Sequence, residues 1–597
     1  MAANVSLIVN RALLDPNFES YRLSLDPIPT YSVQLQEGVD EVELSEDLYT
    51  RDHVRVYGMR NHLVADPWDA TSVYYVDRAG RVQRVRVALD TYLGTPVPVF
   101  RLAREVAGSP GRVSTSMHFL SEERAALCDG AGTLLVLHTG ARAVETDAAW
   151  EVVYSGAVST PSLVVDGLQR AGAAGSVLEL LLLRVERDPA PSSKSGFHSA
   201  LEWLTLEPDE GVVGPARFSV SRRRELAGPS APFYVALEPW GAGIVVAADR
   251  ALRVTSDSAR PVAEEEEQVE VKEEEEEKEE EEEEKELGVD DVKAPPYQWQ
   301  QTSEDVTVTF DLPEDTPKGD VEVTVTPERL EVGVKGGATL LRGELAGRAD
   351  PEGSAWTWSP GRLELTLMKA EPSGDWAELL AGGVGGANGA NGATQGDDFE
   401  RRPVEQVAYN PQQLEECDAA PEEMATLCRI DGDSHARTYT VNLGGHQFLF
   451  TAQLAAGDMP GLCLRHDVDA LLWRPRPQDD ARPWEHLDTF NALGYVQASK
   501  QERKFLACAP GRAFAALCEC SRRVFLYRQP AASPGTQLRK RSRDGRPGDG
   551  RVARQQVATL EAAGSEPFLG FVVTDERVFL LTQSKLLALR VTETAHG

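Results

Sequence analysis

Apolar and polar residues alternate strictly in several short runs between Tyr297 and Leu380. In the first run, Val306, Val308 and Phe310 alternate with threonines, which gives a strand one apolar and one polar face. The same period recurs, with prolines and glycines between the runs, at 321–325, 330–334 and 363–367. Short strands with turns about every dozen residues predict an antiparallel β-sandwich that buries the apolar faces.

Three tryptophans, Trp299, Trp356 and Trp376, lie where these runs begin or end. Each is large enough to supply a substantial share of a small domain's core, and a core role is favoured over a binding role. Leu367 belongs to the apolar face of the last run, so we count it with the tryptophans as a structural residue of this domain.

The order of several strings in this segment resembles a CS domain of the NudC type. These strings are Tyr297 to Thr302, Leu330 to Gly336, Leu341 to Leu345, Ser354 to Trp356 and Leu363 to Lys369. The resemblance implies a p23-like β-sandwich and a co-chaperone of heat shock protein 90 rather than an enzyme. One departure is that Ala377 follows Trp376, where the family often has a second tryptophan.

The resemblance to NudC-family proteins spans nearly the whole chain. It is carried outside the CS segment by Leu13 to Pro16, Ser72 to Asp77, Cys463 to Trp473 and Asn491 to Lys500. It implies heat shock protein 90 and client proteins as partners. Family members are also connected with dynein-dependent transport, so a dynein-related cytoskeletal adaptor is the alternative function.

The matched turn of the CS segment holds the candidate protein-interaction residues, Lys335, Gly336 and Gly337, with Glu344 nearby. The alternative for either glycine is that it only supplies a positive φ angle in the turn.

Both flanks of the CS segment repeat a unit of apolar strand, tight turn and apolar strand. Such small antiparallel sheets at intervals of about 40 to 50 residues indicate a β-propeller. We expect about four blades from the first flank and about three from the second, with the strand Val5 to Val9 closing the ring against the last blade. Two independent β domains are the alternative. Helical character is expected as decoration at 412–428 and 468–473.

The predicted fold class is therefore all-β, with a CS domain inserted into a propeller built from both ends of the chain. The predicted domains are the first part of the propeller at 1–255, an acidic linker at 256–295, the CS domain at 296–380, a Gly/Ala/Asn-rich linker at 381–403 and the second part of the propeller at 404–597.

The acidity of the chain is concentrated in one tract. The net charge is −34, and 264–286 holds 17 glutamates against three lysines. An acidic chain is not expected to bind nucleic acid directly, because that affinity comes from lysine and arginine at phosphates. The tract is expected to act as a spacer, with recognition of a basic partner as the alternative.

A basic cluster of Arg539, Lys540, Arg541 and Arg543 is a candidate nuclear import signal, with a plain exposed loop as the alternative. The first residues lack signal-peptide form, no run is long enough to span a bilayer, and the seven cysteines do not form a disulfide pattern. We therefore expect a cytoplasmic and nuclear protein without membrane contact.

Motifs for catalysis are absent from the sequence. There is no Gly-x-x-x-x-Gly-Lys phosphate loop and no Gly-x-Ser-x-Gly elbow. Histidine beside carboxylates at His466, Asp467 and Asp469 has the chemistry for metal binding or proton transfer, but a salt bridge or hydrogen bond in a turn is favoured.

Cysteines 508, 518 and 520 lack the paired spacing of a zinc site and are expected to be buried. We predict no metal, no cofactor and no catalytic residue, which makes a propeller hydrolase the least favoured function.

Overall fold

A computed structural model describes the chain from residue 3 to residue 591 with gaps in loops. The longest gaps are 104–110, 189–195, 210–216, 263–296, 312–320, 381–424 and 532–551. The chain divides into two compact units, Met1–Val262 with Val407–Gly597, and Ala263–Gln406. None of the described helices combines the length and apolar character needed to cross a membrane.

The smaller unit is a sandwich of two antiparallel sheets. One sheet has the order β20-β21-β26-β25 and the other has the order β22-β23-β24. The strands are β20 (Tyr297–Gln301), β21 (Asp305–Asp311), β22 (Val321–Val325), β23 (Arg329–Val334), β24 (Thr339–Glu344), β25 (Ala349–Ser359) and β26 (Arg362–Lys369).

The core of the sandwich consists of the alternating residues that predicted it. Val306, Val308 and Phe310 of β21 are buried, and they meet Leu330 and Val332 of β23 from the other sheet. The leucines of β26 complete this layer. The predicted β-sandwich is therefore confirmed, with its polar alternate positions facing away from the core.

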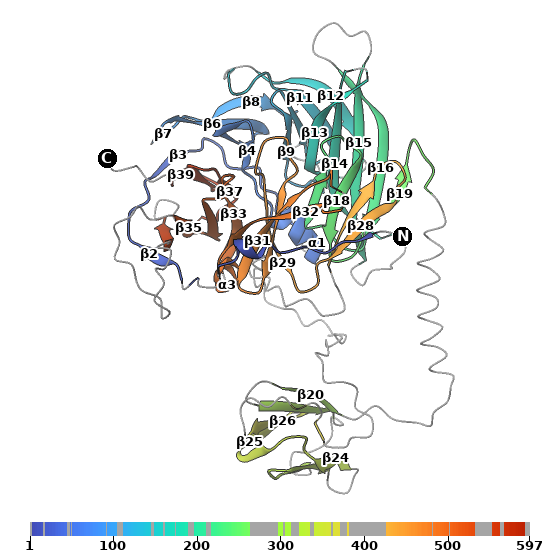
Figure 1. The fold of residues 1–597 in the computed structure, drawn as a ribbon, viewed down its shortest axis with the longest axis vertical. Helices are drawn as coiled ribbons and strands as arrows, with labels where there is room; N and C mark the ends of the chain where they lie inside the picture. The colour runs from blue at the N-terminus through green and yellow to red at the C-terminus, as the bar shows by residue number, and fades with distance from the viewer. Residues whose placement is uncertain are drawn as a thin grey trace. The chain divides into compact units, whose positions relative to one another are not determined.

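The larger unit contains seven sheets within its described residues, and they are arranged as the blades of a β-propeller (Figure 1). The first strand of a blade contacts the first strand of the next, as in β4 with β9, β9 with β13, β33 with β37 and β37 with β4. These first strands therefore line a central channel.

The first three blades come from the chain before the CS domain. Blade 1 consists of β4 (Val64–Asp66), β5 (Asp69–Val76), β6 (Arg81–Leu89), β7 (Tyr92–Leu93) and β8 (Val97–Arg101). Blade 2 consists of β9 (Ser116–Ser121), β10 (Arg124–Cys128), β11 (Thr133–His138) and β12 (Glu151–Ala157). Blade 3 consists of β13 (Leu163–Gly172), β14 (Gly175–Arg187), β15 (Phe197–Pro208), β16 (Phe218–Gly228) and the added outer strand β19 (Arg253–Asp257).

Blade 4 is divided by the CS domain. It pairs β17 (Tyr234–Leu237) and β18 (Gly243–Ala248) from the first flank with β27 (Thr426–Asp431) and β28 (Arg437–Asn442) from the second. The junction is the antiparallel β18–β27 ladder, from Gly243 with Asp431 to Ala248 with Thr426. Since one sheet contains strands from both flanks, the propeller is assembled from both, and the alternative of two independent β domains is wrong.

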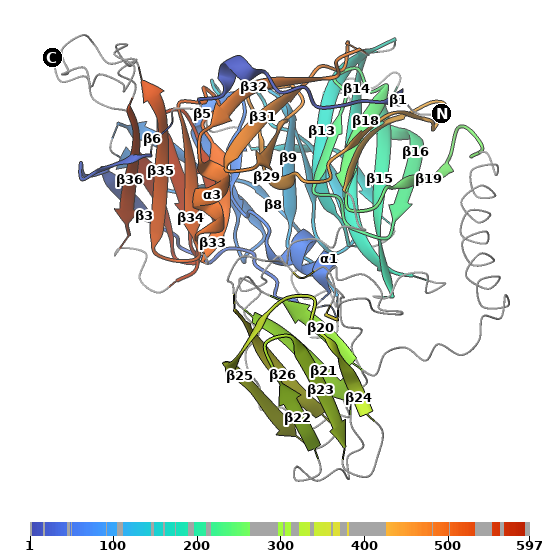
Figure 2. The ribbon, with the colours of Figure 1, turned by 60° about the horizontal axis from the view of Figure 1, so that its bottom comes forward.

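The last three blades come from the second flank. Blade 5 consists of β29 (Gln447–Ala452), β30 (Gly461–His466), β31 (Asp469–Pro475) and β32 (Trp484–Phe490). Blade 6 consists of β33 (Arg503–Cys508), β34 (Phe514–Glu519), β35 (Arg523–Ala531) and β36 (Val552–Thr559), which lie side by side in Figure 2. Blade 7 consists of β37 (Gly570–Val573), β38 (Arg577–Leu581) and β39 (Lys585–Arg590), with β3 (Thr30–Gln34) as its outer strand.

The first residues of the chain add outer strands to three blades. In chain order, β1 (Ala3–Asn4) pairs with β28, β2 (Arg22–Ser24) pairs with β36 and β3 pairs with β39. The blue strand β3 lies beside the red strand β39 in Figure 1. Strand β3, residues 30–34, thus closes the ring. The prediction that Val5 to Val9 would pair with the last blade is wrong, because that stretch follows the edge of blade 4.

Helices are few and short in the described residues. They are the 3₁₀ helix at Arg11–Leu13, α1 (Arg51–His53), the π-helical turn Val54–Gly58 that continues it, and α3 (Leu493–Ala498). The expected helix at 468–473 is wrong, because this apolar run is β31, buried between blades. Of the expected helix at 412–428, the part from Thr426 onward is strand β27, and 412–424 lies outside the described residues.

One face of the propeller, which we name the insertion face, carries the connections between the second and third strands of the blades. It includes the β5–β6 turn and the start of β27, where the chain returns from the CS domain to the propeller. The long connection from β3 to β4 lies on this face. The Arg78 amide donates to Gly38 O at 2.8 Å, the Ala231 amide donates to Asp52 Oδ1 at 3.0 Å, and the His62 amide donates to Leu569 O at 2.9 Å.

A cluster of ionic hydrogen bonds joins the two flanks where the CS domain interrupts them. Asp257, at the end of β19, accepts hydrogen bonds from Arg222 Nη2 at 2.5 Å and from His435 Nε2 at 2.7 Å. Arg222 also donates to Asp433 Oδ1 at 2.6 Å. Burial alone would raise the pKa of Asp257, but the hydrogen bonds from Arg222, the Ala259 amide and His435 hold it well below its ordinary value.

We expect Asp257→Asn to lower the free energy of unfolding of the propeller by about 2 kcal/mol at pH 7, because Arg222 loses a buried anionic acceptor. The lowered pKa means that the carboxylate stabilises the fold above its unfolded pKa of about 4 and that this contribution is lost as pH falls further. Urea unfolding of both proteins between pH 7 and pH 3 measures the difference, which should shrink below about pH 4.

The matched control is Asp433→Asn, which removes the exposed partner of the same arginine and should cost about 0 to 1 kcal/mol. Equal losses for the two variants would contradict the special role of Asp257.

Candidate protein-interaction site

The matched turn of the CS domain joins β23 to β24. Its candidate residues Lys335, Gly336 and Gly337 lie outside the described residues, so their contact role stays a prediction. The fourth candidate, Glu344, is the last residue of β24. Its side chain is exposed and lies 4.0 Å from the Arg329 guanidinium, a surface ion pair that leaves the carboxylate accessible to a partner.

The structural residues of the CS domain surround one core. Leu367 of β26 is fully buried opposite Val306 of β21. Trp299 and Trp356 are partly buried and pack against the same cluster. Trp376 is buried, and it lies so close to Gly347 that a Cβ atom at that glycine would be 2.0 Å from the indole nitrogen.

We expect Leu367→Pro to abolish the unfolding transition of the CS domain while the propeller keeps its own, because proline removes a strand hydrogen bond in a central position. Calorimetry of the full chain measures both transitions. The control Leu367→Ile keeps the side-chain volume and should cost less than about 1.5 kcal/mol. Retention of both transitions in the proline variant would show that the assignment of the strand is wrong.

The candidate residues for metal or proton chemistry form a turn between β30 and β31. His466 stacks on His446 with ring centroids 5.2 Å apart, and Asp469 Oδ1 accepts the Ala492 amide at 2.6 Å. Asp467 has a φ angle of 54°, which this tight turn requires. In the part of the chain that the structure describes, no group of three or more His, Cys, Asp or Glu is placed to hold a metal ion.

The three cysteines considered for zinc line blade 6. Cys508 and Cys518 are buried, and Cys520 is partly buried. Burial raises the pKa of Cys508 to about 12 and raises the pKa of Cys518 well above its ordinary value. The thiols therefore stay protonated at neutral pH and pack as small apolar side chains.

The candidate nuclear import residues Arg539, Lys540, Arg541 and Arg543 fall in the connection between β35 and β36, outside the described residues. Their role stays a prediction.

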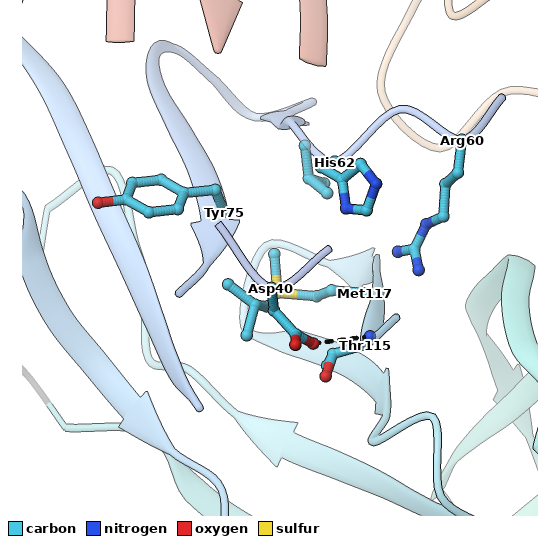
Figure 3. A pocket seen from close by; sticks show the side chains of 8 residues that line it. Asp40, Arg60, His62, Tyr75, Thr115 and Met117 are labelled. Atoms are coloured by element: carbon cyan, nitrogen blue, oxygen red, sulfur yellow. Dashed lines mark hydrogen bonds between the residues drawn. The ribbon is translucent and has the colours of Figure 1, made fainter. Parts of the chain in front are cut away.

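A small pocket opens on the insertion face between blades 1 and 2. Its polar lining comes from Asp40, Arg60 and His62 of the β3–β4 connection and from Thr115, directly before β9 (Figure 3). The apolar lining comes from β4, β5 and β9. In Figure 3, Arg60 and His62 point into the space from one side, and Asp40 and Thr115 lie on the other.

The charges around this pocket are unevenly paired. Burial, with help from Arg60 and Lys504, lowers the pKa of His62 to about 3, so the imidazole is neutral at physiological pH. Burial lowers the pKa of Arg60 only to about 10, so its guanidinium stays charged. Although burial opposes it, hydrogen bonding by Arg112 and Thr115 lowers the pKa of Asp40.

Sequence reasoning did not identify this pocket. Arg60 and His62 lie in a stretch without strand or helix periodicity. Lys504 lies at a polar position of an ordinary alternating strand pattern. Their convergence depends on the path of the β3–β4 connection across the insertion face, which no local pattern encodes.

Comparison with known protein families agrees with the assignment of the smaller unit. The CS domain family matches residues 295–369. NudC domain-containing protein 1 of Xenopus laevis is 41% identical over 606 residues, covering 99% of this chain and 100% of that protein. The chain belongs to the NudC domain-containing protein 1 family.

The mouse member of the NudC domain-containing protein 1 family is 39% identical to this chain and covers 99% of both chains. Membership confirms the resemblance seen in the sequence. CS domains and NudC domain-containing proteins are in general non-catalytic. Among solved structures, the WD40 domain of SCAP from fission yeast covers 96% of this chain and 98% of its own, with 9% identity and a TM-score of 0.30.

Proposed function

We propose that this protein is a non-enzymatic co-chaperone and adaptor that links heat shock protein 90 to client proteins. In this proposal the CS domain engages the chaperone and the propeller presents a second protein-binding face. The observation that carries the proposal is the insertion of a CS domain into blade 4 of a propeller, which places two compact units on one chain.

The arrangement supports an adaptor because tethering changes the energetics of weak contacts. When one module has bound its partner, the second module meets the other partner at a high local concentration, so two weak contacts give a useful complex. The insertion leaves both modules with separate cores, the CS core around Val308 and Leu365 and the blade cores of the propeller. Each module therefore buries its own core without residues of the other.

We further propose that the protein works in the cytoplasm and the nucleus, with the basic cluster around Arg541 as the import signal. Neither nucleic acid nor membrane is a proposed ligand. Dynein-pathway proteins are the alternative partners.

We expect heat shock protein 90 to follow the CS domain and client proteins to follow the propeller. Co-purification from cells compares the intact chain, the segment 296–380 alone and a chain that lacks 296–380. The chain without the CS domain should lose the chaperone and keep clients. Co-purification of clients only with 296–380 would assign client selection to the CS domain, and recovery of dynein-pathway proteins instead of the chaperone would overturn the proposal.

Leu367→Pro in the full chain is the matched control, because it keeps the length and composition of the protein while unfolding the CS domain. If chaperone binding survives this variant, the contact does not depend on the folded CS domain.

Deletion of 264–286 tests whether the acidic tract competes with partners for a basic surface. The tract carries 17 glutamates against three lysines, so its removal should tighten partner binding at low salt and have less effect at high salt. Isothermal titration at two ionic strengths measures the change, and unchanged affinity would leave the tract as a spacer.

A further inference from the structure

Arg60 is a partly buried cation without a carboxylate at ion-pair distance among the described residues. Its Nη1 donates to the carbonyl oxygen of Ser114 at 2.9 Å. A guanidinium has five N–H donors and is always charged at neutral pH, so one carbonyl oxygen leaves most of its hydrogen-bonding capacity unused. The remaining N–H groups of Arg60 are therefore available to a ligand that enters the pocket.

The carboxylate that lines the same pocket is already engaged. Both Nη atoms of Arg112 donate to Asp40, and the Thr115 amide donates to Asp40 Oδ2 at 3.0 Å. Arg112 and Thr115 therefore take the hydrogen bonds of Asp40, and this carboxylate attracts Arg60 only from beyond ion-pair distance.

The other charged groups near the pocket add one cation and one anion. Lys504, at the start of β33, is partly buried, and burial lowers its pKa while Glu41 raises it. Glu41 is exposed and accepts a hydrogen bond from Gln583 Nε2 at 2.8 Å. Among the described residues, Asp40 is hydrogen-bonded to Arg112 and Glu41 attracts Lys504, so Arg60 is the cation of this group without an anion of its own.

The pocket also has the size and polarity for one oxygen atom of a ligand. Its volume is about 10 Å³, close to the space of one water molecule. His62 adds a neutral ring that can donate or accept a hydrogen bond, and Val64 and Met117 form apolar walls. A carboxylate that enters from the insertion face can place one oxygen in the pocket and keep the other at its mouth.

We propose that this pocket binds a carboxylate side chain of an acidic segment in a partner protein, with Arg60 as its cationic anchor and His62 as a second hydrogen-bonding group. The proposal deepens the adaptor function, on which the choice of a protein ligand rests. It names the chemistry of the partner that the insertion face of the propeller recognises, which is acidic rather than basic or purely apolar.

The test is the binding of a fluorescein-labelled peptide of alternating glutamate and glycine to the purified full chain, followed by fluorescence anisotropy. Arg60→Met should weaken binding at least about tenfold, because it removes the cation that pairs with the carboxylate. The matched control is Arg78→Met, which removes an exposed arginine from the β5–β6 turn of the same face and should change affinity by less than about twofold. Equal weakening by the two variants would mean that only bulk charge matters and would overturn the site.

Thermal melting separates a binding role from a structural one. If Arg60 serves the ligand, Arg60→Met without peptide should melt no lower than the natural chain, and the peptide should no longer raise its melting temperature. A variant that melts lower but binds peptide with unchanged affinity would assign Arg60 to the support of Ser114 and overturn the proposal. Arg60→Lys, which keeps the charge but not the planar fork, should bind with intermediate affinity if the fork is used.

Inorganic phosphate and a peptide of alternating glutamine and glycine complete the test. Displacement of the acidic peptide by equimolar phosphate would replace the carboxylate assignment with a general anion site. Binding of the glutamine peptide with equal affinity would exclude recognition of charge. These measurements contain neither chaperone nor client, so a result that contradicts the pocket does not contradict the adaptor function. A co-purification result that contradicts the adaptor function does not contradict anion binding by the pocket.

Discussion

The pairing of β18 with β27 is the interaction on which the rest of the structure depends. It joins the two halves of the chain inside one blade, across the whole length of the inserted CS domain. The faces of these strands are apolar on both sides, as Ile244 and Val246 pack toward blade 3 while Val245 and Ala247 pack toward blade 5. A blade of this kind cannot bury both faces alone, so every blade requires its two neighbours, and the ring requires the divided blade.

The charged residues reinforce the same junction. Buried ion pairs add little net stability, but they penalise wrong arrangements because an unpaired partner is costly. Glu238 of blade 4 pairs with Arg429 of β27, and Arg222 of blade 3 reaches the β27–β28 turn at Asp433. Both contacts join the first flank to the second, so they favour the register in which blade 4 is correctly assembled.

Local periodicity made the strands predictable from the sequence. Features that depend on pairing between distant segments were not predictable in this way. The alternation in β21 and β26 needed no tertiary information, because each strand has one buried face. The apolar run at Leu471 to Trp473 is buried on both sides, which removes the alternation and led to the mistaken helix. The closing strand was misassigned because both Thr30 to Gln34 and Val5 to Val9 have apolar residues at every second position, and the choice between them depends on distant partners. The pocket at Arg60 was not predictable for the same reason.

Blade 7 also combines strands from the two ends of the chain, and these strands are made at different times during synthesis. Strand β3 emerges from the ribosome early, and about 550 residues separate it from its partner β39. At about 5 to 20 residues per second, roughly half a minute to two minutes pass before that partner exists. The CS domain lies wholly between them and has all of its strands before blades 5, 6 and 7 have been made. The CS domain therefore has all of its strands on each nascent chain while the propeller is still an open set of sheets with unpaired edges.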